Sequence, residues 1–237
     1  MSEMLVQVEN LSFAYPDGTR ALDGVSFTVA AGERVALAGP NGAGKSTLLL
    51  ALSGMLHEGT DGSIRVAGLL VEKANLGRIR QKLGLVFQNP DDQLFCPTVL
   101  DDVAFGPRNM RLPAEEVARR AAAALAAVGL AGFERRSPFH LSLGEKKRAA
   151  IATVLSMQPA ILALDEPTSM LDPRGRKDVA RLLRRLGGTQ IIVTHDLPMI
   201  ADLCHRVVVL SRGRVVADAP PAEALADPAF LELHGLA

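Results

Sequence analysis

The sequence lacks an excess of charge of either sign. Among its 237 residues, 26 Lys and Arg residues are matched by 26 Asp and Glu residues. Without a net basic field, such a chain has no general attraction for the phosphates of duplex DNA or RNA. We therefore expect no nucleic-acid partner, although the composition still allows a local basic patch.

Cysteine is scarce, and the side chains that bind transition metals are scattered. Cys96 and Cys204 lie far apart, with no CxxC pair and no Cys/His spacing of the kind zinc requires. We expect both to be free thiols in a reducing cytosol. The five histidines show no ligand spacing either, so we do not expect the chain itself to handle a metal cargo.

Long hydrophobic runs are also missing. The longest apolar stretches, such as residues 121–130 and 151–155, are far shorter than the roughly 20 residues needed to cross a bilayer. The segment MSEMLVQVEN has an acidic residue and neither a basic region nor a long apolar one, so it is not typical of a signal peptide. The sequence predicts a soluble or peripheral protein.

At roughly 150 residues per domain, 237 residues make one large domain or one and a half small ones, long enough to bury a sizeable core without disulfide or metal staples. Turn-rich pieces separate short strands that we expect at residues 5–8, 26–29 and 34–38. Later apolar β runs alternate with helical patterns, which predicts an α/β fold around a mainly parallel sheet. These runs are residues 83–87, 161–164, 191–193 and 207–210.

The strand signal disappears between residues 89 and 138. Helical patterns at residues 99–108 and 113–128 take over, with Pro113 suited to the first position of its helix. This change predicts a helical subdomain. From Arg214 onward we expect one more strand and a short helical tail.

A glycine-rich segment follows the strand at residues 34–38 and precedes a helical run at residues 48–52. It fits the pattern G-x-x-x-x-G-K-[ST], in which backbone N–H groups and the helix N-terminus together stabilise a polyphosphate. We expect Lys45 to reach the β and γ phosphates and Ser46 to supply an oxygen ligand for Mg²⁺. A plain turn would not require Lys and Ser in this order. The nucleotide-binding residues predicted here are Gly39, Pro40, Asn41, Gly42, Ala43, Gly44, Lys45, Ser46 and Thr47.

Two adjacent carboxylates end the apolar strand at residues 161–164. Asp165 and Glu166 are therefore expected at the carboxyl edge of the sheet, where open α/β folds bind ligands. We predict that Asp165 holds the Mg²⁺ shell and that Glu166 polarises the attacking water. An isolated Asp-Glu pair is more often a solvated strand end or a helix cap, and it is the phosphate loop that favours the functional interpretation.

Further motifs follow in a characteristic order. Gln88 follows a strand, residues 141–145 read LSLGE, residues 169–172 read SMLD, and residues 194–196 read THD. Together with the phosphate loop and the Asp-Glu pair, they resemble an ABC-type ATPase over nearly the whole chain. The resemblance implies one ATPase domain over residues 1–237, with an N-terminal antiparallel β subdomain, a helical subdomain at about 89–157 and a tail at about 211–237.

The resemblance also implies roles for individual residues. Tyr15 would stack on adenine, Gln88 would link Mg²⁺ to a membrane partner, and Asp172 would lie at a dimer interface. His195 would touch the γ-phosphate. Lys45, Gln88, Glu166 and His195 are thus the expected catalytic residues, and Ser46, Gln88 and Asp165 the expected Mg²⁺ ligands. A lone histidine is usually a packing or surface residue, but this one follows a strand's carboxyl end.

The LSLGE segment resembles the signature motif that closes over ATP held by an opposite subunit. Ser142 and Gly144 would make the phosphate contacts, which implies a functional dimer. The family pattern is Leu-Ser-Gly-Gly-Gln, so Leu143 and Glu145 depart from it. Leu143 loses glycine's conformational freedom, and Glu145 brings negative charge toward a phosphate. The alternative is a plain N-capped helix.

The segment FQNPDDQLF at residues 87–95, with residues 97–99 and 102–107, looks like the ATPase subunits of energy-coupling-factor importers. Residues 173–176 and 201–207 are most similar to the ATPases of cobalt and nickel importers. In the energy-coupling-factor ATPases as a group, Leu94, Phe95 and Val99 would contact a coupling helix, and the alternative is internal packing. The alternative to cobalt or nickel import is an energy-coupling-factor module that imports a vitamin.

The resemblance implies three protein partners on the cytoplasmic face of the cell membrane, where the chain would be peripheral. They are a second ATPase subunit, which is another copy or a related chain, a membrane coupling subunit, and a substrate-binding membrane subunit. Two other functions are open. A nucleic-acid ATPase of this family would carry a coiled-coil insertion or tandem cores, and a regulatory module without turnover would lack Glu166 or His195.

Overall fold

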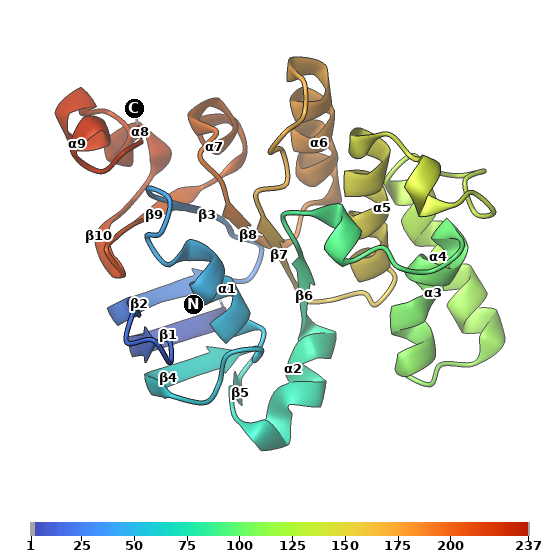
Figure 1. Ribbon diagram of the computed structural model, residues 1–237, viewed down its shortest axis with the longest axis horizontal. Coiled ribbons are helices and arrows are strands. Elements are labelled where there is room, and N and C mark those ends of the chain that lie inside the picture. The colour runs from blue at the N-terminus through green and yellow to red at the C-terminus, as the bar shows by residue number, and fades with distance from the viewer. Residues whose placement is uncertain (1–2, 237) are drawn as a thin grey trace.

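A computed structural model describes residues 3–236 of the chain. It contains two β-sheets (Figure 1). The smaller sheet is antiparallel, with strand order β2-β1-β4-β5. Its strands are β1 (Met4–Ala14), β2 (Arg20–Ala30), β4 (Thr60–Val66) and β5 (Leu69–Leu70). The strands expected at residues 5–8 and 26–29 are therefore parts of longer strands, which a tight turn from Tyr15 to Gly18 connects.

The larger sheet has the strand order β10-β9-β3-β8-β7-β6. All neighbours are parallel except β9 and β10, so the prediction of a mainly parallel sheet is confirmed. Its strands are β3 (Arg34–Ala38), β6 (Leu83–Val86), β7 (Ile161–Asp165), β8 (Thr189–Val193), β9 (Arg206–Ser211) and β10 (Arg214–Ala219). Both faces of the central strands are buried, as is usual for parallel sheets.

Side chains of the large sheet alternate between two hydrophobic cores. Ala36, Leu164 and Ile192 face one core, whereas Leu37 and Ala163 face the other. The first core is closed by the helices between residues 99 and 203, and the second by the helices at residues 45–52 and 76–82 and by the antiparallel sheet. Because a strand sends successive side chains to opposite faces, a single apolar strand serves both cores.

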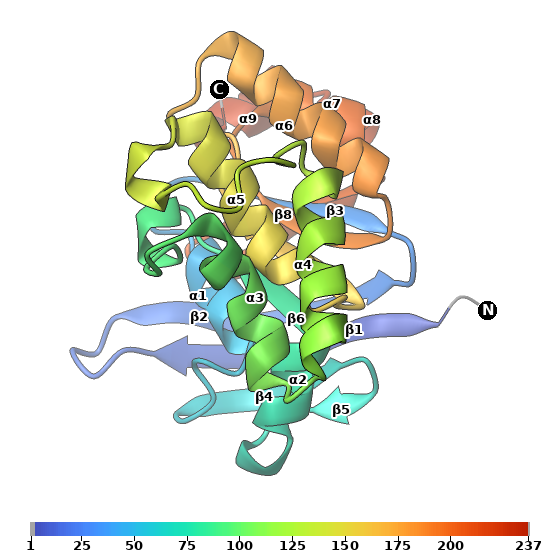
Figure 2. The same ribbon diagram turned by 90° about the vertical axis from the view of Figure 1, so that its right-hand side faces the viewer.

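Helices cover the two faces unequally, and Figure 2 shows α3, α4 and α5 gathered on one side of the large sheet. The α-helices of the described residues are α1 (Lys45–Leu52), α2 (Leu76–Lys82), α3 (Val99–Asn109), α4 (Ala114–Ala127), α5 (Leu143–Leu155), α6 (Pro173–Leu186), α7 (Leu197–Leu203), α8 (Pro221–Ala224) and α9 (Pro228–Leu233). Five of them begin at side-chain caps, which satisfy free backbone N–H groups. The caps are Thr98 for α3, Ser142 for α5, Asp172 for α6, Asp196 for α7 and Asp227 for α9. Short 3₁₀ turns are η1 (Lys73–Asn75), η2 (Pro90–Asp92) and η3 (Pro138–His140).

Several expectations are met in detail and one is wrong. Pro113 is the N-cap of α4 rather than its first residue, with an extended backbone that starts the helix at Ala114. Cys96 and Cys204 are both free, as expected. Burial raises the pKa of the Cys204 thiol to about 12. Over residues 3–236, no helix is both long enough and apolar enough to cross a membrane.

Candidate functional site

The phosphate-loop motif forms the turn between β3 and α1, as its sequence predicts. Gly39 has a φ of 141°, and a Cβ on it would lie 2.0 Å from the carbonyl oxygen of Leu210. Gly44 has a φ of 100°, and a Cβ there would lie 2.3 Å from the carbonyl oxygen of Ala21. Neither position accepts a side chain, so the two glycines let the loop lie directly against β9 and β2.

The Lys45 side chain folds back across this loop. Its Nζ donates to the carbonyl oxygens of Gly39 and Pro40, at 2.7 and 2.8 Å. Burial lowers the pKa of Lys45, while the carboxylates of Glu166 and Asp165 raise it, and burial dominates. A partly desolvated ammonium held only by neutral carbonyls is well placed to exchange them for phosphate oxygens, which bind it more strongly.

Tyr15 lies at the mouth of the loop. Its hydroxyl is 3.0 Å from Oγ1 of Thr47, and its ring meets Phe13 edge-on with centroids 5.0 Å apart. The hairpin turn between β1 and β2 thus brings an aromatic ring to the first turn of α1. Tyr15 is about one-third exposed.

The ends of β7 and β8 bring the acidic pair and the histidine together. Asp165 pairs with Val193 in the parallel register, and the Glu166 N–H donates to the Val193 carbonyl at 2.9 Å. His195 follows β8, and its Nδ1 lies 3.0 Å from Oε1 of Glu166. The register of two neighbouring strands therefore sets the contact between this carboxylate and the imidazole.

The Asp165 carboxylate is arranged as a magnesium ligand would be. Its Oδ1 atom is buried and has no hydrogen-bond partner among the described residues. Burial raises the pKa of Asp165, and the nearby Ser46 hydroxyl and Lys45 ammonium oppose that rise. One orphaned carboxylate oxygen beside a hydroxyl fits Mg²⁺, which takes few protein ligands and several from phosphate and water. In the described chain, no group of three or more His, Cys, Asp or Glu side chains is placed to hold a metal ion.

These groups share one cavity of about 440 Å³. Of the predicted site residues, Tyr15, Asn41, Gly42, Ala43, Gly44, Lys45, Ser46, Thr47, Gln88, Asp165, Glu166 and His195 line it. Thr19, Arg20, Ala21 and Val193 also line it and were not predicted from the sequence. The first three come from the β1–β2 hairpin, whose sequence carries no phosphate-binding pattern. Their place could not be found without knowing how the two sheets meet.

Gly39 and Pro40 belong to the phosphate loop and accept from the Lys45 ammonium, whereas Ser142, Gly144 and Asp172 lie elsewhere in this copy of the chain. Ser142 and Gly144, at the start of α5, line a separate cavity of about 430 Å³ with Glu145 and Arg148. Asp172 caps α6, and its Oδ1 accepts a hydrogen bond from the Gly175 N–H at 2.7 Å. A single copy therefore does not bring the signature segment to the phosphate loop.

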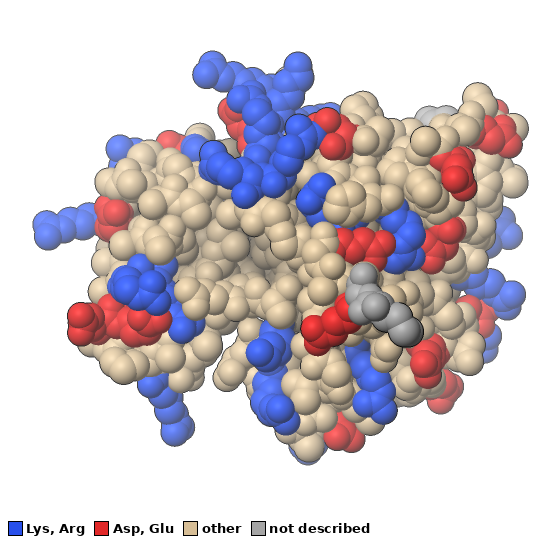
Figure 3. Space-filling view, turned by 180° about the vertical axis from the view of Figure 1, so that it is seen from behind, with Lys and Arg blue, Asp and Glu red and all other residues tan. Residues whose placement is uncertain are grey.

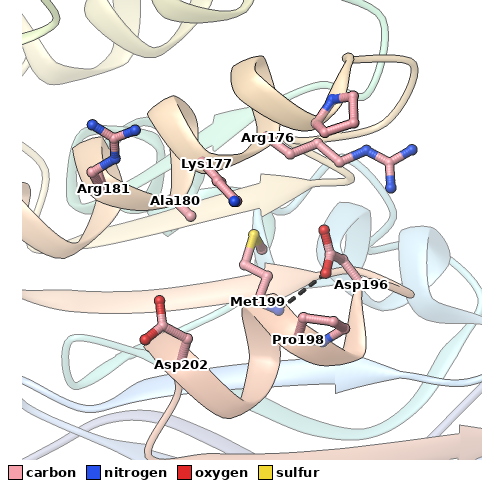
Figure 4. A pocket seen from close by; sticks show the side chains of 9 residues that line it. Arg176, Lys177, Ala180, Arg181, Asp196, Pro198, Met199 and Asp202 are labelled. Carbon is pink, nitrogen blue, oxygen red and sulfur yellow. Dashed lines mark hydrogen bonds between the residues drawn. The ribbon is translucent and has the colours of Figure 1, made fainter.

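A larger cavity of about 540 Å³ lies between α6 and α7 (Figure 4). The basic side chains of Arg176, Lys177 and Arg181 line one wall, and Asp196 and Asp202 line the other. Figure 3 shows a group of basic side chains at the end of the molecule where α6 lies. The opposed charges of the two walls partly cancel, and the cavity has no glycine-rich cradle, so nothing in it selects an anion.

Comparison with known proteins identifies the family of this site. The family described as "ABC transporter" matches residues 22–169. The energy-coupling factor transporter ATP-binding protein EcfA of Carboxydothermus hydrogenoformans is 49% identical, covering 98% of this chain and 87% of that protein. EcfA of Methanothermobacter thermautotrophicus is 50% identical, covering 98% of this chain and 76% of that protein.

Solved structures agree with these sequence relatives. The structure of CbiO1 from Clostridium perfringens, part of the ABC transporter complex CbiONQ, has a TM-score of 0.86 and 38% identity, covering 99% of this chain and 95% of that one. A dimeric ATP-binding cassette in a post-hydrolysis state, bound to ADP and Pi, has a TM-score of 0.80 and 29% identity, covering 91% and 98%. Both resemblances therefore cover at least 91% of the chain.

Proposed function

The chain belongs to the ABC transporter family, and we propose that its ATP hydrolysis drives an energy-coupling-factor importer of cobalt or nickel ions. The observation that carries the proposal is the meeting of Lys45, Asp165, Glu166 and His195 in one cavity. The EcfA relatives and the CbiO1 structure, part of the ABC transporter complex CbiONQ, support the transporter class. Residues 173–176 and 201–207, which resemble the ATPases of cobalt and nickel importers, support the metal cargo.

ATP would bind with its phosphates over the glycine loop and the start of α1. Lys45 exchanges its carbonyl acceptors for phosphate oxygens, and the Tyr15 ring receives the adenine base. Ser46 and Asp165, with Gln88, are the residues suited to hold Mg²⁺, which when bound neutralises charge on the β and γ phosphates. The buried Oδ1 of Asp165, which has no hydrogen-bond partner among the described residues, supports this assignment.

The Glu166 carboxylate is positioned to accept a proton from the attacking water. His195 holds Oε1 of that carboxylate, while Oε2 is buried and has no hydrogen-bond partner in the described residues. The free oxygen is therefore the one we assign to the water. Phosphoryl transfer depends mainly on such positioning and on charge stabilisation. His195 is also exposed enough at the cavity rim to meet the γ-phosphate.

A second ATPase subunit would complete the site. Ser142 and Gly144 lie outside the nucleotide cavity of their own copy, at the exposed N-terminus of α5. Helix N-termini bind phosphate through free N–H groups and the helix dipole. A partner copy that presents this segment to the γ-phosphate would make dimer closure dependent on ATP.

The membrane coupling subunit would dock at the loop that follows Gln88. Leu94 and Val99 are buried at 2% and 0% exposure, so the alternative of internal packing is correct for both. Phe95 is 60% exposed and Phe105 45%, and their rings meet edge-on at 5.0 Å. An exposed aromatic pair of this kind is suited to a protein contact. Localisation at the membrane would follow from that contact.

The transported solute would be chosen outside this chain. The nucleotide cavity contains the groups for phosphate chemistry, and the described residues offer no cluster for a transition metal. A vitamin importer would use the same ATPase, so it is the second candidate for the cargo.

The test is to purify a tagged copy from detergent-solubilised membranes of the native host and to identify the proteins that accompany it. We expect a coupling membrane protein, a metal-binding membrane protein and cobalt- or nickel-dependent uptake in the intact cells. A vitamin-binding membrane protein would refute the metal cargo. The absence of any membrane protein, under conditions that preserve other transporter complexes, would refute the transport function.

A further inference from the structure

Lys147 is a buried lysine that the nucleotide chemistry described above does not use. It lies in the first turns of α5, and its side chain is among the largest fully buried ones, at 1% exposure. Taking an ammonium out of water costs several kcal/mol unless it is paired and hydrogen-bonded. The buried ammonium of Lys147 must therefore be stabilised by hydrogen bonds to its neighbours.

The ammonium of Lys147 has a partner for each of its three N–H groups. Its Nζ donates to the main-chain carbonyl of Gln88 at 2.7 Å, to that of Glu166 at 2.9 Å and to Oγ of Ser169 at 3.2 Å. The Ser169 hydroxyl in turn donates to the Glu166 carbonyl at 2.9 Å. One side chain of the signature helix thus joins the loop after β6 to the loop after β7.

The backbone that Lys147 holds is conformationally strained. Glu166 has a φ of 44°, a left-handed value that costs a residue with a side chain about 1–3 kcal/mol. Such a conformation persists only where the surrounding structure imposes it. The peptide before Glu166 is fixed by its bond to Val193, and the peptide after it by Lys147 and Ser169. The direction of the Glu166 side chain therefore depends on these bonds.

The loop at Gln88 is bound to α5 by a second residue. Gln93 accepts from the Phe87 N–H at 3.1 Å, and its amide donates to the Ala150 carbonyl at 2.9 Å and to Oγ1 of Thr153 at 2.7 Å. The segment from Phe87 to Gln93 is thus attached to the helix along two of its turns. A displacement of α5 would carry this segment with it, and Lys147 would transmit the displacement to Glu166.

We infer that Lys147 is a positioning residue. Its three hydrogen bonds fix the backbone of Glu166 relative to Gln88 and to α5. The orientation of the Glu166 carboxylate therefore depends on the position of α5. The inference rests on the proposed role of Glu166 in hydrolysis. Misplacement of a reacting group by about 1 Å can cost about 10²-fold in rate. Binding of ATP, which depends on the glycine loop and Lys45, would be unaffected.

Two substitutions separate positioning from mere packing. Lys147→Met keeps the length and apolar stem but removes every donor, whereas Lys147→Gln keeps two N–H donors without the charge. In the isolated protein we expect Lys147→Met to lower kcat about 10²-fold with KM for ATP within about threefold. We expect Lys147→Gln to restore at least about tenfold of the lost rate, as the loss came from missing hydrogen bonds.

Lys82→Met is the matched control, because Lys82 is an exposed lysine in the last turn of α2, outside the contacts that join α5 to the loops after β6 and β7. Removing an exposed charge changes little, so kcat should stay within about twofold. ATP affinity, measured by fluorescence of a labelled analogue, and the melting temperature are recorded for every variant. A Lys147→Met protein that folds poorly leaves Lys147→Gln to be compared with wild type, with a kcat loss and unchanged ATP affinity still expected.

The outcomes distinguish this inference from the proposed function. Unchanged kcat in Lys147→Met, while Glu166→Gln is inactive, would overturn the role of Lys147 and leave the ATPase function standing. Equal losses in kcat and ATP affinity, or a Gln variant no faster than the Met variant, would also overturn it, because both outcomes indicate general damage to the fold. A wild-type chain that binds ATP but does not hydrolyse it under any condition would overturn both.

Discussion

The Glu145 carboxylate holds the signature serine at both of its donors. Its Oε2 atom accepts from the Ser142 N–H at 2.8 Å and from the Ser142 hydroxyl at 2.7 Å, while the Glu145 N–H points back to the serine oxygen at 3.4 Å. These hydrogen bonds from Ser142 lower the pKa of Glu145. Glu145, which stands where the family has glutamine, therefore forms a capping box with Ser142. The Ser142 hydroxyl has one proton, and it donates this proton to the Glu145 carboxylate instead of to a phosphate.

Replacing Glu145 with Gln should tighten the ATP-dependent dimer. The change removes one negative charge beside the position proposed for a γ-phosphate, and a unit charge at about 4 Å is worth about 1 kcal/mol in a watery site. We expect the dimer dissociation constant to fall about fivefold for each site. Sedimentation equilibrium with MgATP, in a background that carries Glu166→Gln to prevent turnover, measures it.

The control for this prediction is Glu115→Gln, an exposed acid in the first turn of α4. It removes the same charge far from the start of α5 and should leave the dimer constant unchanged. If Glu145→Gln and Glu115→Gln shift the constant equally, the effect is one of net charge, and the assigned contact between Ser142 and phosphate is wrong.

Replacing Glu166 with Gln should abolish turnover without abolishing ATP binding. The amide keeps the hydrogen-bond geometry toward His195 but cannot accept the proton of the attacking water. We expect kcat to fall by about 10²–10⁴-fold, the usual contribution of a positioned base. Phosphate release measures the rate of hydrolysis, and titration with a labelled nucleotide analogue measures ATP binding. Full activity in this variant would refute the role assigned to the carboxylate.

The phosphate loop could be predicted from sequence because its chemistry is local. Gly39 and Gly44 lie against the backbone of β9 and β2, but the reason they are needed is already visible in the nine-residue pattern from 39 to 47. The contact between Glu166 and His195 could be anticipated in part, because carboxyl ends of parallel strands share one edge of a sheet. The chain order alone does not reveal that β7 and β8 are neighbours.

The parts that were missed depend on long-range packing. The three acceptors of Lys147 lie 59, 19 and 22 residues away in the sequence, so no local pattern indicates why this lysine is buried. β4 contains Asp61, Gly62 and Ser63, residues that are unusual in strands, and it exists because β1 pairs with it. The orientation of Leu94 inward and Phe95 outward likewise follows from a loop that no periodic pattern governs.

Replacing Phe95 with Asp should weaken the association with membrane partners and leave the isolated ATPase intact. The ring is 60% exposed, so its removal costs the fold little more than one edge-on contact with Phe105, about 1 kcal/mol. A buried aromatic anchor at an interface is worth about 2 kcal/mol or more, which corresponds to roughly 30-fold in affinity. We expect ATP hydrolysis by the isolated chain within about twofold of wild type, and a large loss of co-purified membrane protein.

The control is Leu233→Asp on α9, which lies at the opposite end of the molecule from α3 (Figure 1); this leucine is 78% exposed. It adds the same charge to an exposed apolar position and should leave co-purification unchanged. Wild-type yields of the membrane protein with Phe95→Asp would place the docking surface elsewhere.

Replacing Arg206 with Met should destabilise the junction between the two sheets in a manner that depends on pH. Arg206, on β9, donates to Glu33 at 2.7 Å, to Asp218 at 2.6 Å and to the Thr28 carbonyl of β2 at 2.5 Å. Its side chain and that of Glu33 are only about one-fifth exposed. Loss of hydrogen bonds to a partly buried charge should lower the unfolding free energy by about 3 kcal/mol at neutral pH.

The sign of the pH dependence follows from Glu33. Burial raises the pKa of Glu33, but the hydrogen bonds from Arg206 and from the Ala30 N–H outweigh it, so the folded pKa lies below the ordinary value of 4.5. Such a group contributes stability that is present above pH 4.5 and is lost as the pH falls through the folded pKa. Urea unfolding from pH 7 to pH 3 should therefore show that the excess unfolding free energy of wild type over Arg206→Met shrinks in acid.

The control is Arg181→Met, which removes an exposed pair with Asp178 and should have little effect on the unfolding free energy at any pH. A constant difference between Arg206→Met and wild type down to pH 3 would show that packing of the arginine, and not its bond to the Glu33 carboxylate, joins the sheets.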